Sequence, residues 1–326
     1  MRPRHAALAA LIVCALRYDG AGPAVAQSWP SRPLTMVVPF AAGGGTDVLG
    51  RIVGRRLSEV LGQQVIIENV GGAGGMVGSA RVVKAAPDGY QFVLGSRADA
   101  INQTLYKNPL YNFATELAPV VLIADQPTLL VARKDFPADN LREFIAYAKA
   151  NQASMQMASA GAGSTGHLDC MLLNAAIGIN VTHVPYRGGG PAMQDLIAGR
   201  IDYFCTLSAT AQQIEGKLVK AIAIPSRDRS SMLPGLASAQ EQGLNFEAST
   251  WFGFFLPRGT AEPIIRKLHD ATVAAMETPS VQERLKEVGA LTVAPERRSP
   301  AYLQTFVASE IEKNAAPIRA AGIAID

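Results

Sequence analysis

Residues 34–62 read LTMVVPFAAGGGTDVLGRIVGRRLSEVLG, which places an apolar run, a glycine-rich segment and an amphipathic segment in direct succession. The apolar run at 34–38 has the composition of a buried strand. The segment after Asp47 has helical periodicity and stops at Gly62, a normal helix end. A strand that leads through a short loop into a helix is the repeating unit of an α/β protein. The apolar helix face contains Val48, Leu49, Ile52, Val53, Leu57, Val60 and Leu61.

The same alternation of short apolar runs with amphipathic segments continues along most of the chain. It predicts parallel sheets whose two faces are covered by helices. Asn140, with Glu143 three residues later, forms a capping pattern for one of these helices. Three more helices are expected at 262–277, 280–288 and 299–320. The predicted strands lie at 34–38, 64–69, 91–95, 120–124, 129–133, 154–159, 181–184, 201–206, 219–224 and 251–256.

The chain has 326 residues, and a single hydrophobic core seldom grows beyond about 250 to 300 residues, so two lobes are expected. The segments 126–133 and 246–256 are predicted to cross between them. The first lobe is therefore placed at 27–127 and 251–326, and the second lobe at 128–250. Two lobes joined by two extended segments form a hinge with a cleft, which suits ligand capture by closure.

Composition narrows the classes of function. Apolar residues make up 48% of the chain and charged residues 17%, which excludes a disordered protein. The formal net charge is only +3, and no run of five like charges occurs. Binding to nucleic acid or to a membrane surface therefore has little electrostatic support.

Residues 1–26 have the pattern of a secretory signal peptide: a basic start, an apolar stretch at 6–16 and a small-residue cleavage site ending at Ala26. The alternative is a buried amino-terminal strand or helix. Export would remove Cys14 and leave Cys170 and Cys205 in an oxidising compartment. These two cysteines either form a disulfide or are two small buried apolar side chains.

Three predicted strand-to-helix junctions, at 39–47, 160–167 and 185–191, are rich in glycine and small residues. Glycine lets a ligand approach the backbone closely because it has no Cβ. Each junction opens a helix, whose free amides and positive dipole end attract anions. Because the carboxyl ends of strands in an open α/β sheet face one crevice, the junctions are expected to converge on a carboxylate.

A dinucleotide or a metal has weaker signals at these junctions. Gly161, Gly163 and Gly166 match the pattern G-x-G-x-x-G, but no acidic residue follows about 20 residues later to bind a ribose. The local cluster of metal-ligand residue types lacks the paired spacings of a metal site. Neither a cofactor nor a metal is therefore expected. That cluster consists of His167, Asp169, Cys170 and His183.

An exported serine hydrolase is the alternative from another class of function. Ser164 lies in a segment close to a nucleophile elbow, and Asp195 or Asp202 and then His269 follow in hydrolase order. However, Ala162 stands where glycine is usual in that motif. A helix cap that also donates to a ligand explains Ser164 better.

Five segments of the chain carry a recognisable pattern: WPSRPLTMVVPFAAGGGTDVLGR (29–51), VIIENVGGAGGMVGSARVVKAAPDGY (65–90), ASAGAGSTGHL (158–168), THVPYRGGGPAMQDLIAGRID (182–202) and WFGFFLPRGT (251–260). In order and spacing they resemble the extracytoplasmic receptors of tripartite tricarboxylate transporters, the TctC or Bug family. The resemblance covers residues 29–326. It implies a two-lobed periplasmic binding protein of the Venus flytrap type, each lobe a mostly parallel sheet flanked by helices. Such a receptor closes on a small carboxylated solute and delivers it to membrane permease subunits, without catalysis.

The resemblance also implies that backbone amides, hydroxyls and bridging waters of the first two loops hold the ligand, with a smaller share for the third loop. The solute is expected to be a di-, tri- or aromatic carboxylate. Arg187 either clamps a second carboxylate or is solvated, and Tyr186 and Phe40 either line the pocket or belong to the lobe cores. The implied ligand-binding positions are Phe40, Ala41, Gly43, Gly44, Thr46, Asp47, Ala160, Gly161, Gly163, Ser164, Thr165, His167, Tyr186, Gly188 and Gly189.

The chain departs from the family pattern at two places. After the strand segment at 201–205 it continues with Thr206, Leu207 and Ser208, where many relatives carry an acidic residue or an amide. A solute with an amino group would lack an acidic partner there. The stretch Ser96-Arg97-Ala98-Asp99 is more charged than the family's loop. Ser96 is added to the ligand-binding positions, and Arg97 is a candidate partner for a second carboxylate.

Overall fold

The computed structural model describes residues 29–207, 210–230 and 233–325. The predicted signal peptide and Cys14 lie outside the described residues. The strands are β1 (Leu34–Val38), β2 (Val65–Asn69), β3 (Gln91–Ser96), β4 (Leu117–Arg133), β5 (Gln156–Ser159), β6 (Thr182–Pro185), β7 (Tyr203–Leu207), β8 (Val219–Ala223), β9 (Ser249–Pro257) and β10 (Leu291–Thr292). The helices are α1 (Gly45–Leu61), α2 (Met76–Val83), α3 (Arg97–Leu105), α4 (Phe113–Glu116), α5 (Leu141–Asn151), α6 (Thr165–Ile177), α7 (Gly189–Ile197), α8 (Ala211–Glu215), α9 (Glu262–Met276), α10 (Pro279–Glu287) and α11 (Pro300–Ala320), with 3-10 turns η1 (Ala73–Gly75) and η3 (Pro295–Arg297).

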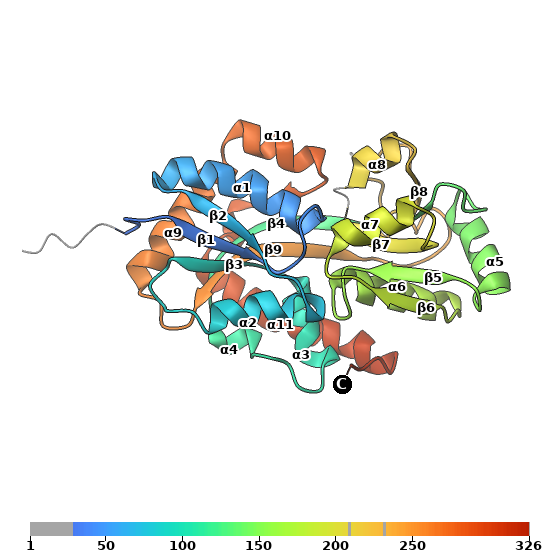
Figure 1. Cartoon of the computed structure of the whole chain (residues 1–326), viewed down its shortest axis with the longest axis horizontal. Coiled ribbons are helices and arrows are strands. Elements are labelled where there is room, and N and C mark those ends of the chain that lie inside the picture. The colour runs from blue at the N-terminus through green and yellow to red at the C-terminus, as the bar shows by residue number, and fades with distance from the viewer. Residues whose placement is uncertain (1–28, 208–209, 231–232, 326) are drawn as a thin grey trace, which may run out of the picture.

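The strands form a mixed sheet in the order β2-β1-β3-β9-β4-β7-β5-β6, and β8 and β10 pair with β4. One parallel group consists of β2, β1 and β3, and the other of β7, β5 and β6. The antiparallel pair β4 and β9 connects the two groups. Figure 1 shows the parallel groups on opposite sides of the molecule, with β4 and β9 running between them.

The connection through β4 differs from the sequence-based expectation. Two strands were predicted at 120–124 and 129–133, but the structure has one strand of 17 residues. Gln126, one of the polar residues that interrupt the apolar pattern, is buried inside the strand, where its amide donates to the carbonyl of Val288 at 2.7 Å. Pro127 lies opposite Ser249, the last recorded pair between β4 and β9, where a missing N–H is tolerated.

Two apolar cores lie on either side of this connection. We call β1–β3, α1–α4 and α9–α11 the first lobe, and α5–α8 and β5–β8 the second lobe. The core of the first lobe uses residues up to Ala124 and from Trp251 onward. The second lobe has two apolar clusters, one on each face of its strands, and a disulfide joins Cys170 on α6 to Cys205 on β7 within one of them.

The helix ends follow the local sequence signals. Gly62 ends α1 in the left-handed conformation, with φ of 67°. The Asn140 side chain caps α5 by accepting a hydrogen bond from the Glu143 amide at 3.0 Å. Among the described residues, no helix combines the length and apolar character needed to cross a membrane.

Candidate functional site

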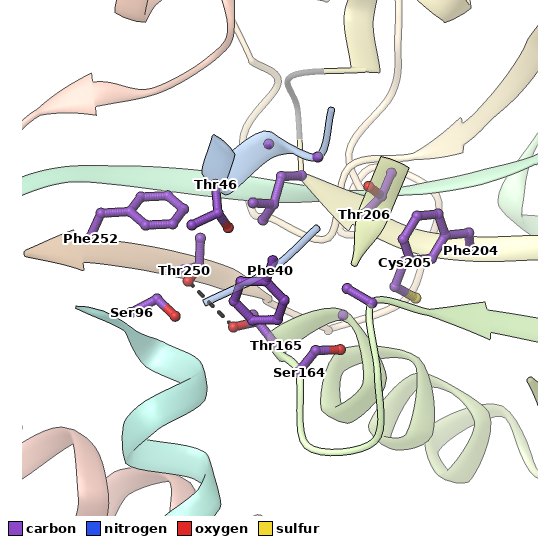
Figure 2. A pocket seen from close by; sticks show the side chains of 16 residues that line it. Phe40, Thr46, Ser96, Ser164, Thr165, Phe204, Cys205, Thr206, Thr250 and Phe252 are labelled. Atoms are coloured by element: carbon purple, nitrogen blue, oxygen red, sulfur yellow. Dashed lines mark hydrogen bonds between the residues drawn. The ribbon is translucent and has the colours of Figure 1, made fainter. Parts of the chain in front are cut away.

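A cleft lies between the two lobes. Loops after the parallel strands of both lobes form its walls together with strand β9 (Figure 2). Short hydroxyl side chains and phenylalanine rings face each other across it. The lining residues are Phe40, Gly44, Gly45, Thr46, Ser96, Ala160, Ser164, Thr165, Gly166, Gly189, Phe204, Cys205, Thr206, Leu207, Thr250 and Phe252.

Four helices begin at this cleft. Gly44 caps α1 and Ser96 caps α3 from the first lobe. Ser164 caps α6 and Gly189 is the first residue of α7 from the second lobe. The first-turn amides of a helix have no partner within it and carry the positive end of its dipole. None of the described residues that line the cleft is charged, so its positive potential comes from the backbone and suits an anion.

The four helix starts offer different donors. Gly44 and Gly188, the N-caps of α1 and α7, provide no side-chain acceptor for the first-turn amides. Ser96 and Ser164 each accept a hydrogen bond at 3.3 Å from an amide in the first turn of their own helix. A hydroxyl that accepts in this way keeps its hydrogen for another partner. The cleft therefore combines open amides from two helices with hydroxyl donors from the other two.

Ser96 is held in place by a buried carboxyl group. Asp99 Oδ2 accepts a hydrogen bond from the Ser96 amide at 2.8 Å, which completes a capping box. Its Oδ1 accepts from Ser79 Oγ at 2.6 Å and from the Tyr111 hydroxyl. Burial raises the pKa of Asp99 and, with the neighbouring Asp99, holds the pKa of Tyr111 well above its ordinary value. This network fixes the direction of Ser96 from behind the cleft.

Asp47 plays a similar part in the first loop. Its carboxylate accepts hydrogen bonds at 2.9 Å from the amide of Gly43, from Asn69 Nδ2 and from Arg51 Nε. Burial opposes ionisation of Asp47, but these three donors together hold its pKa below the ordinary value. Asp47 thus shapes the glycine loop at 43–45 and lies outside the cleft lining.

A pair of histidines supports the second loop. His167 Nδ1 accepts a hydrogen bond from the Gly163 amide at 3.2 Å, and its ring lies 4.2 Å from that of His183. His183 Nε2 is 2.7 Å from Ser159 Oγ, which accepts from the Gly161 amide at 3.1 Å. Burial lowers the pKa of His167 to about 3, with the neighbouring His183 adding to the shift. Burial also lowers the pKa of His183 to about 4, so both rings are neutral at pH 7.

The structure divides the predicted ligand positions into two groups. Those that line the cleft are Phe40, Gly44, Thr46, Ser96, Ala160, Ser164, Thr165 and Gly189. The others lie behind the lining. Their amides or side chains form hydrogen bonds to other protein groups, or their backbone meets the opposite lobe. These residues are Ala41, Gly43, Asp47, Gly161, Gly163, His167, Tyr186 and Gly188. A direct contact of the second group with a solute stays a prediction.

Sequence reasoning missed part of the lining. Gly45 and Gly166 lie inside the recognised loops, so the motifs already contained them. The remaining residues come from β7 and β9, strands whose role in the cleft depends on how the lobes meet. They are Phe204, Cys205, Thr206, Leu207, Thr250 and Phe252.

The third loop contacts the first lobe. The carbonyl of Arg187 accepts a hydrogen bond from the Ala41 amide at 3.0 Å, across the boundary between the lobes. The Tyr186 hydroxyl donates to Asp195 at 2.6 Å. Tyr106 Oη from the first lobe donates to the carbonyl of Ala162 at 2.9 Å. The bonds from Ala41 to Arg187 and from Tyr106 to Ala162 hold the two lobes together beside the cleft, while the bond from Tyr186 to Asp195 lies within the second lobe.

The residues considered for hydrolysis are not assembled. Asp195 accepts from Tyr186 and from Arg200, and His269 bonds to Asp270 on α9 at 2.8 Å. Ser164 accepts from a backbone amide. In the part of the chain that the structure describes, no group of three or more acidic, histidine or cysteine residues is arranged to hold a metal ion.

Acid should weaken the fold through the histidine pair. In the folded chain the pKa of His167 and that of His183 lie below the ordinary value of 6.5. As the pH falls, the unfolded chain therefore binds protons at these two rings before the folded chain does. The free energy of unfolding should be fully retained above pH 6.5 and should fall toward pH 4, by at most about 1.4 kcal/mol per pH unit for each ring. The half-buried His183 should contribute the smaller share.

Denaturant unfolding at pH 7 and pH 4.5 measures this loss. In the variant His167→Asn/His183→Gln, amide oxygens accept the same two hydrogen bonds but do not titrate in this range. We expect a smaller acid-induced loss of stability than in the wild type. Equal losses in both proteins would contradict the assignment.

The fold matches those of solved structures. The periplasmic binding protein BugD is 38% identical, with a TM-score of 0.88 over 91% of this chain and 99% of that chain. MatC from Rhodopseudomonas palustris with bound malate is 37% identical, with a TM-score of 0.86 over 89% of this chain and all of that chain. The R. palustris protein Rpa4515 with adipate is 33% identical, with a TM-score of 0.86 over 91% of this chain and 99% of that chain.

The sequence leads to the same family. A family model described as "Tripartite tricarboxylate transporter family receptor", TctC, matches residues 49–323. This range contains most of α1, the strands β4 and β9 and all of the second lobe. The TctC receptors of tripartite tricarboxylate transporters are solute-binding proteins, and the chain belongs to this receptor family.

Proposed function

We propose that this chain is a periplasmic receptor that closes on a small carboxylated solute and delivers it to the permease subunits of a tripartite tricarboxylate transporter. One observation carries the proposal: four helix N-termini from two lobes meet in a cleft whose described lining residues include no charged side chain. Such a site binds an anion through the backbone and hydroxyls, without acid–base groups for catalysis.

The available donors are sufficient for useful affinity. A hydrogen bond to a charged group contributes about 1.5 to 3 kcal/mol, and a helix terminus about 0.3 to 2 kcal/mol. Micromolar binding requires about 8 kcal/mol. Four to six contacts of this kind, less the ordering they require, reach that value without a buried arginine.

The lining also favours one class of carboxylate. Thr206 and Leu207 form one wall, and no described lining residue is acidic, so a solute amino group would be buried without a counter-ion. Phe40, Phe204 and Phe252 supply apolar surface instead. The malate and adipate in the related structures are carboxylates without an amino group. We therefore propose a di-, tri- or aromatic carboxylate as the solute.

We further propose that β4 and β9 act as the hinge, which bends near 126–127 and 249–250. The first lobe then consists of residues 27–127 and 251–326, and the second lobe of residues 128–250. Both strands are shared by the lobes, so bending or twisting at this point opens the cleft.

We also propose that the chain is exported and that residues 1–26 are removed. The disulfide between Cys170 and Cys205 supports this proposal, because disulfides persist in an oxidising compartment.

A thermal-shift screen of mono-, di-, tri- and aromatic carboxylates, followed by calorimetry, tests the function. A matching solute should raise the melting temperature by mass action and remain chemically unchanged. A serine-directed phosphonate should leave the protein unlabelled. Covalent labelling of Ser164, or turnover of the solute, would instead support the hydrolase.

Removing either cleft hydroxyl should weaken solute binding. Thr46→Ala and Ser164→Ala should each lose about 1 to 3 kcal/mol of binding free energy, or about 5- to 150-fold in Kd. Ser164→Ala also removes a helix cap, so stability is measured separately from affinity. Thr305→Ala and Ser309→Ala on the exposed face of α11 are matched controls that should bind normally. Unchanged affinity in both cleft variants would mean that this cleft is not the binding site.

A methyl group at Gly190 should block closure while leaving the second lobe intact. A Cβ there would lie 2.3 Å from the carbonyl oxygen of Ala42 in the other lobe. Alanine is also a better helix former than glycine by at most about 1 kcal/mol. We expect Gly190→Ala to keep or raise the melting temperature without solute, and to weaken solute binding at least about tenfold.

Gly235→Ala is the matched control, because nothing lies within 4 Å of a Cβ at that position. It should leave both properties unchanged. Tight binding by Gly190→Ala would show that solute capture does not require the lobes to meet as they do here.

A further inference from the structure

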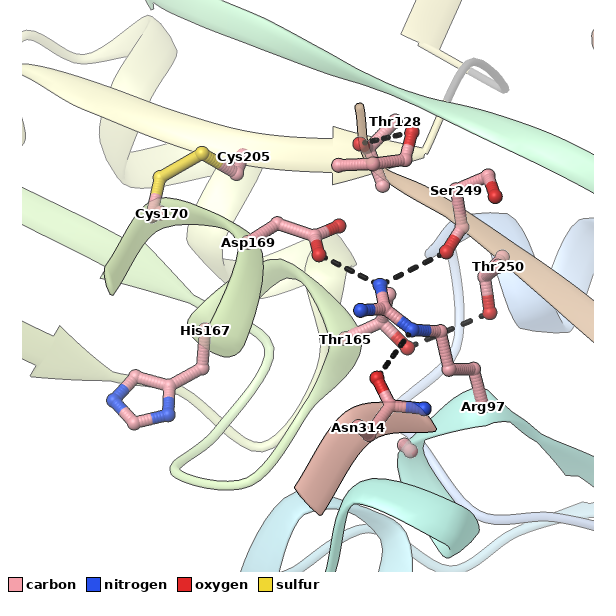
Figure 3. Close-up of polar contacts among 12 residues, drawn as sticks. Arg97, Thr128, Thr165, His167, Asp169, Cys170, Cys205, Ser249, Thr250 and Asn314 are labelled. Carbon is pink, nitrogen blue, oxygen red and sulfur yellow. Dashed lines mark hydrogen bonds and ion pairs between the residues drawn. A yellow bond between two sulfur atoms is a disulfide. The ribbon is translucent and has the colours of Figure 1, made fainter. Parts of the chain in front are cut away.

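Arg97 reaches from the first lobe to a carboxylate of the second lobe. Its Nη1 donates to Asp169 Oδ1 at 2.7 Å and to the carbonyl of Ser249 at 2.9 Å. Its Nε donates to Asn314 Oδ1 at 2.9 Å. Figure 3 shows the guanidinium surrounded by these three partners. The side chain of Arg97 is 13% exposed and that of Asp169 only 1%.

The first lobe and the crossing strand position the guanidinium independently of Asp169. Ser249 is the first residue of β9, and Asn314 lies on α11. Asn314 is itself oriented by donating to the carbonyl of Glu310 at 2.7 Å. Arg97 is thus prepared to receive a carboxylate when the second lobe approaches. Three of its five N–H donors are used in these bonds, and Arg97 is not among the cleft-lining residues, in contrast to the expected contact with a second solute carboxylate.

Each member of the pair lies directly behind a lining residue. Arg97 follows Ser96, the N-cap of α3. Asp169 lies four residues after Thr165 on α6, which places both side chains on the same helix face, one turn apart. Thr165 Oγ1 is in turn 3.4 Å from Thr250 Oγ1 on β9. The ion pair is therefore about one helical turn behind the point where the lobes enclose the cleft.

We propose that Arg97 and Asp169 form a latch between the lobes, which stabilises the closed receptor and lengthens the residence of the solute without touching it. This inference rests on the proposed function of solute capture. Both residues are positioning residues: they act on the solute through the distance between Ser96 and Thr165.

The latch depends on the asymmetry of buried ion pairs. When the lobes separate, water hydrates both charges, so losing the partner matters little in the open form. In the closed form, Asp169 without Arg97 is a buried carboxylate with no counter-ion, which is strongly unfavourable. Replacing both charges by apolar groups of similar size removes that penalty. Each single variant should therefore destabilise the closed form, whereas the double variant should largely restore its stability.

The experiment uses the whole exported chain and two readouts. Spin labels at cysteines replacing the exposed Ile66 and Leu218, one on each lobe, report the distance between lobes without any solute. Stopped-flow and equilibrium binding use malate, adipate and citrate as probes. The variants are Arg97→Met, Asp169→Leu and the double variant Arg97→Met/Asp169→Leu. Arg32→Met is the control, because Arg32 pairs with Asp88 on the surface of the first lobe alone.

We expect each single variant to shift the label distances toward longer values. Each should also weaken binding of any recognised probe on the order of 100-fold, chiefly through faster dissociation. The double variant should return to within about tenfold of the wild type, and Arg32→Met should match the wild type.

Two results would overturn the latch. If Arg97→Met weakens binding while the label distances stay as in the wild type, and the double variant is no better, then Arg97 contacts the solute. If neither distance nor affinity changes, the pair has no role in closure. If the wild type binds none of the probes but Arg97→Met still lengthens the label distances, the latch is upheld and the proposed solute class is wrong.

Discussion

The arrangement of the molecule depends on backbone N–H groups that have no partner within their own helices. Two of the four helix starts at the cleft are capped by glycine, so their first-turn amides have no side-chain acceptor. The lobes bring these starts together from opposite sides, and none of the lining side chains that the structure describes is charged. In the proposed function, a carboxylate completes the hydrogen bonding of these amides, which would give the solute a direct part in holding the lobes closed.

The charged and titratable groups near the cleft act from behind its lining. Asp47 shapes the first loop, Asp99 fixes Ser96, and His167 supports the second loop through the Gly163 amide. Each of these side chains is buried and bonded to backbone amides. Such groups fix the geometry of the donors, while the surface that meets the solute stays neutral. The rigidity of the loops and the selectivity of the site thus come from different residues.

The sequence predicted those features that depend on local chemistry. The ends of β1 and α1, the cap at Asn140 and the three helix-opening loops follow from residue types at fixed spacings. It did not predict that β4 is continuous, because the burial of Gln126 depends on a carbonyl 162 residues away. The same limit explains why Thr250 and Phe252 were missed, and why the hydrogen bonds of Asp47 and His167 to the loop amides of Gly43 and Gly163 were not foreseen. The pairing of Arg97 with Asp169 likewise joins residues 72 positions apart, and neither side chain indicates its partner from sequence alone.

Because β4 pairs antiparallel with β9, the second lobe resembles an insertion into the chain of the first lobe. The chain leaves the first lobe along β4 and returns along β9, and paired strands lie about 4.8 Å apart. Both ends of the inserted segment are therefore anchored at the same place on the same scaffold. Recombination at these two points can exchange the whole second lobe between relatives while the first lobe keeps its core. New combinations of cleft walls can therefore arise in a single genetic step.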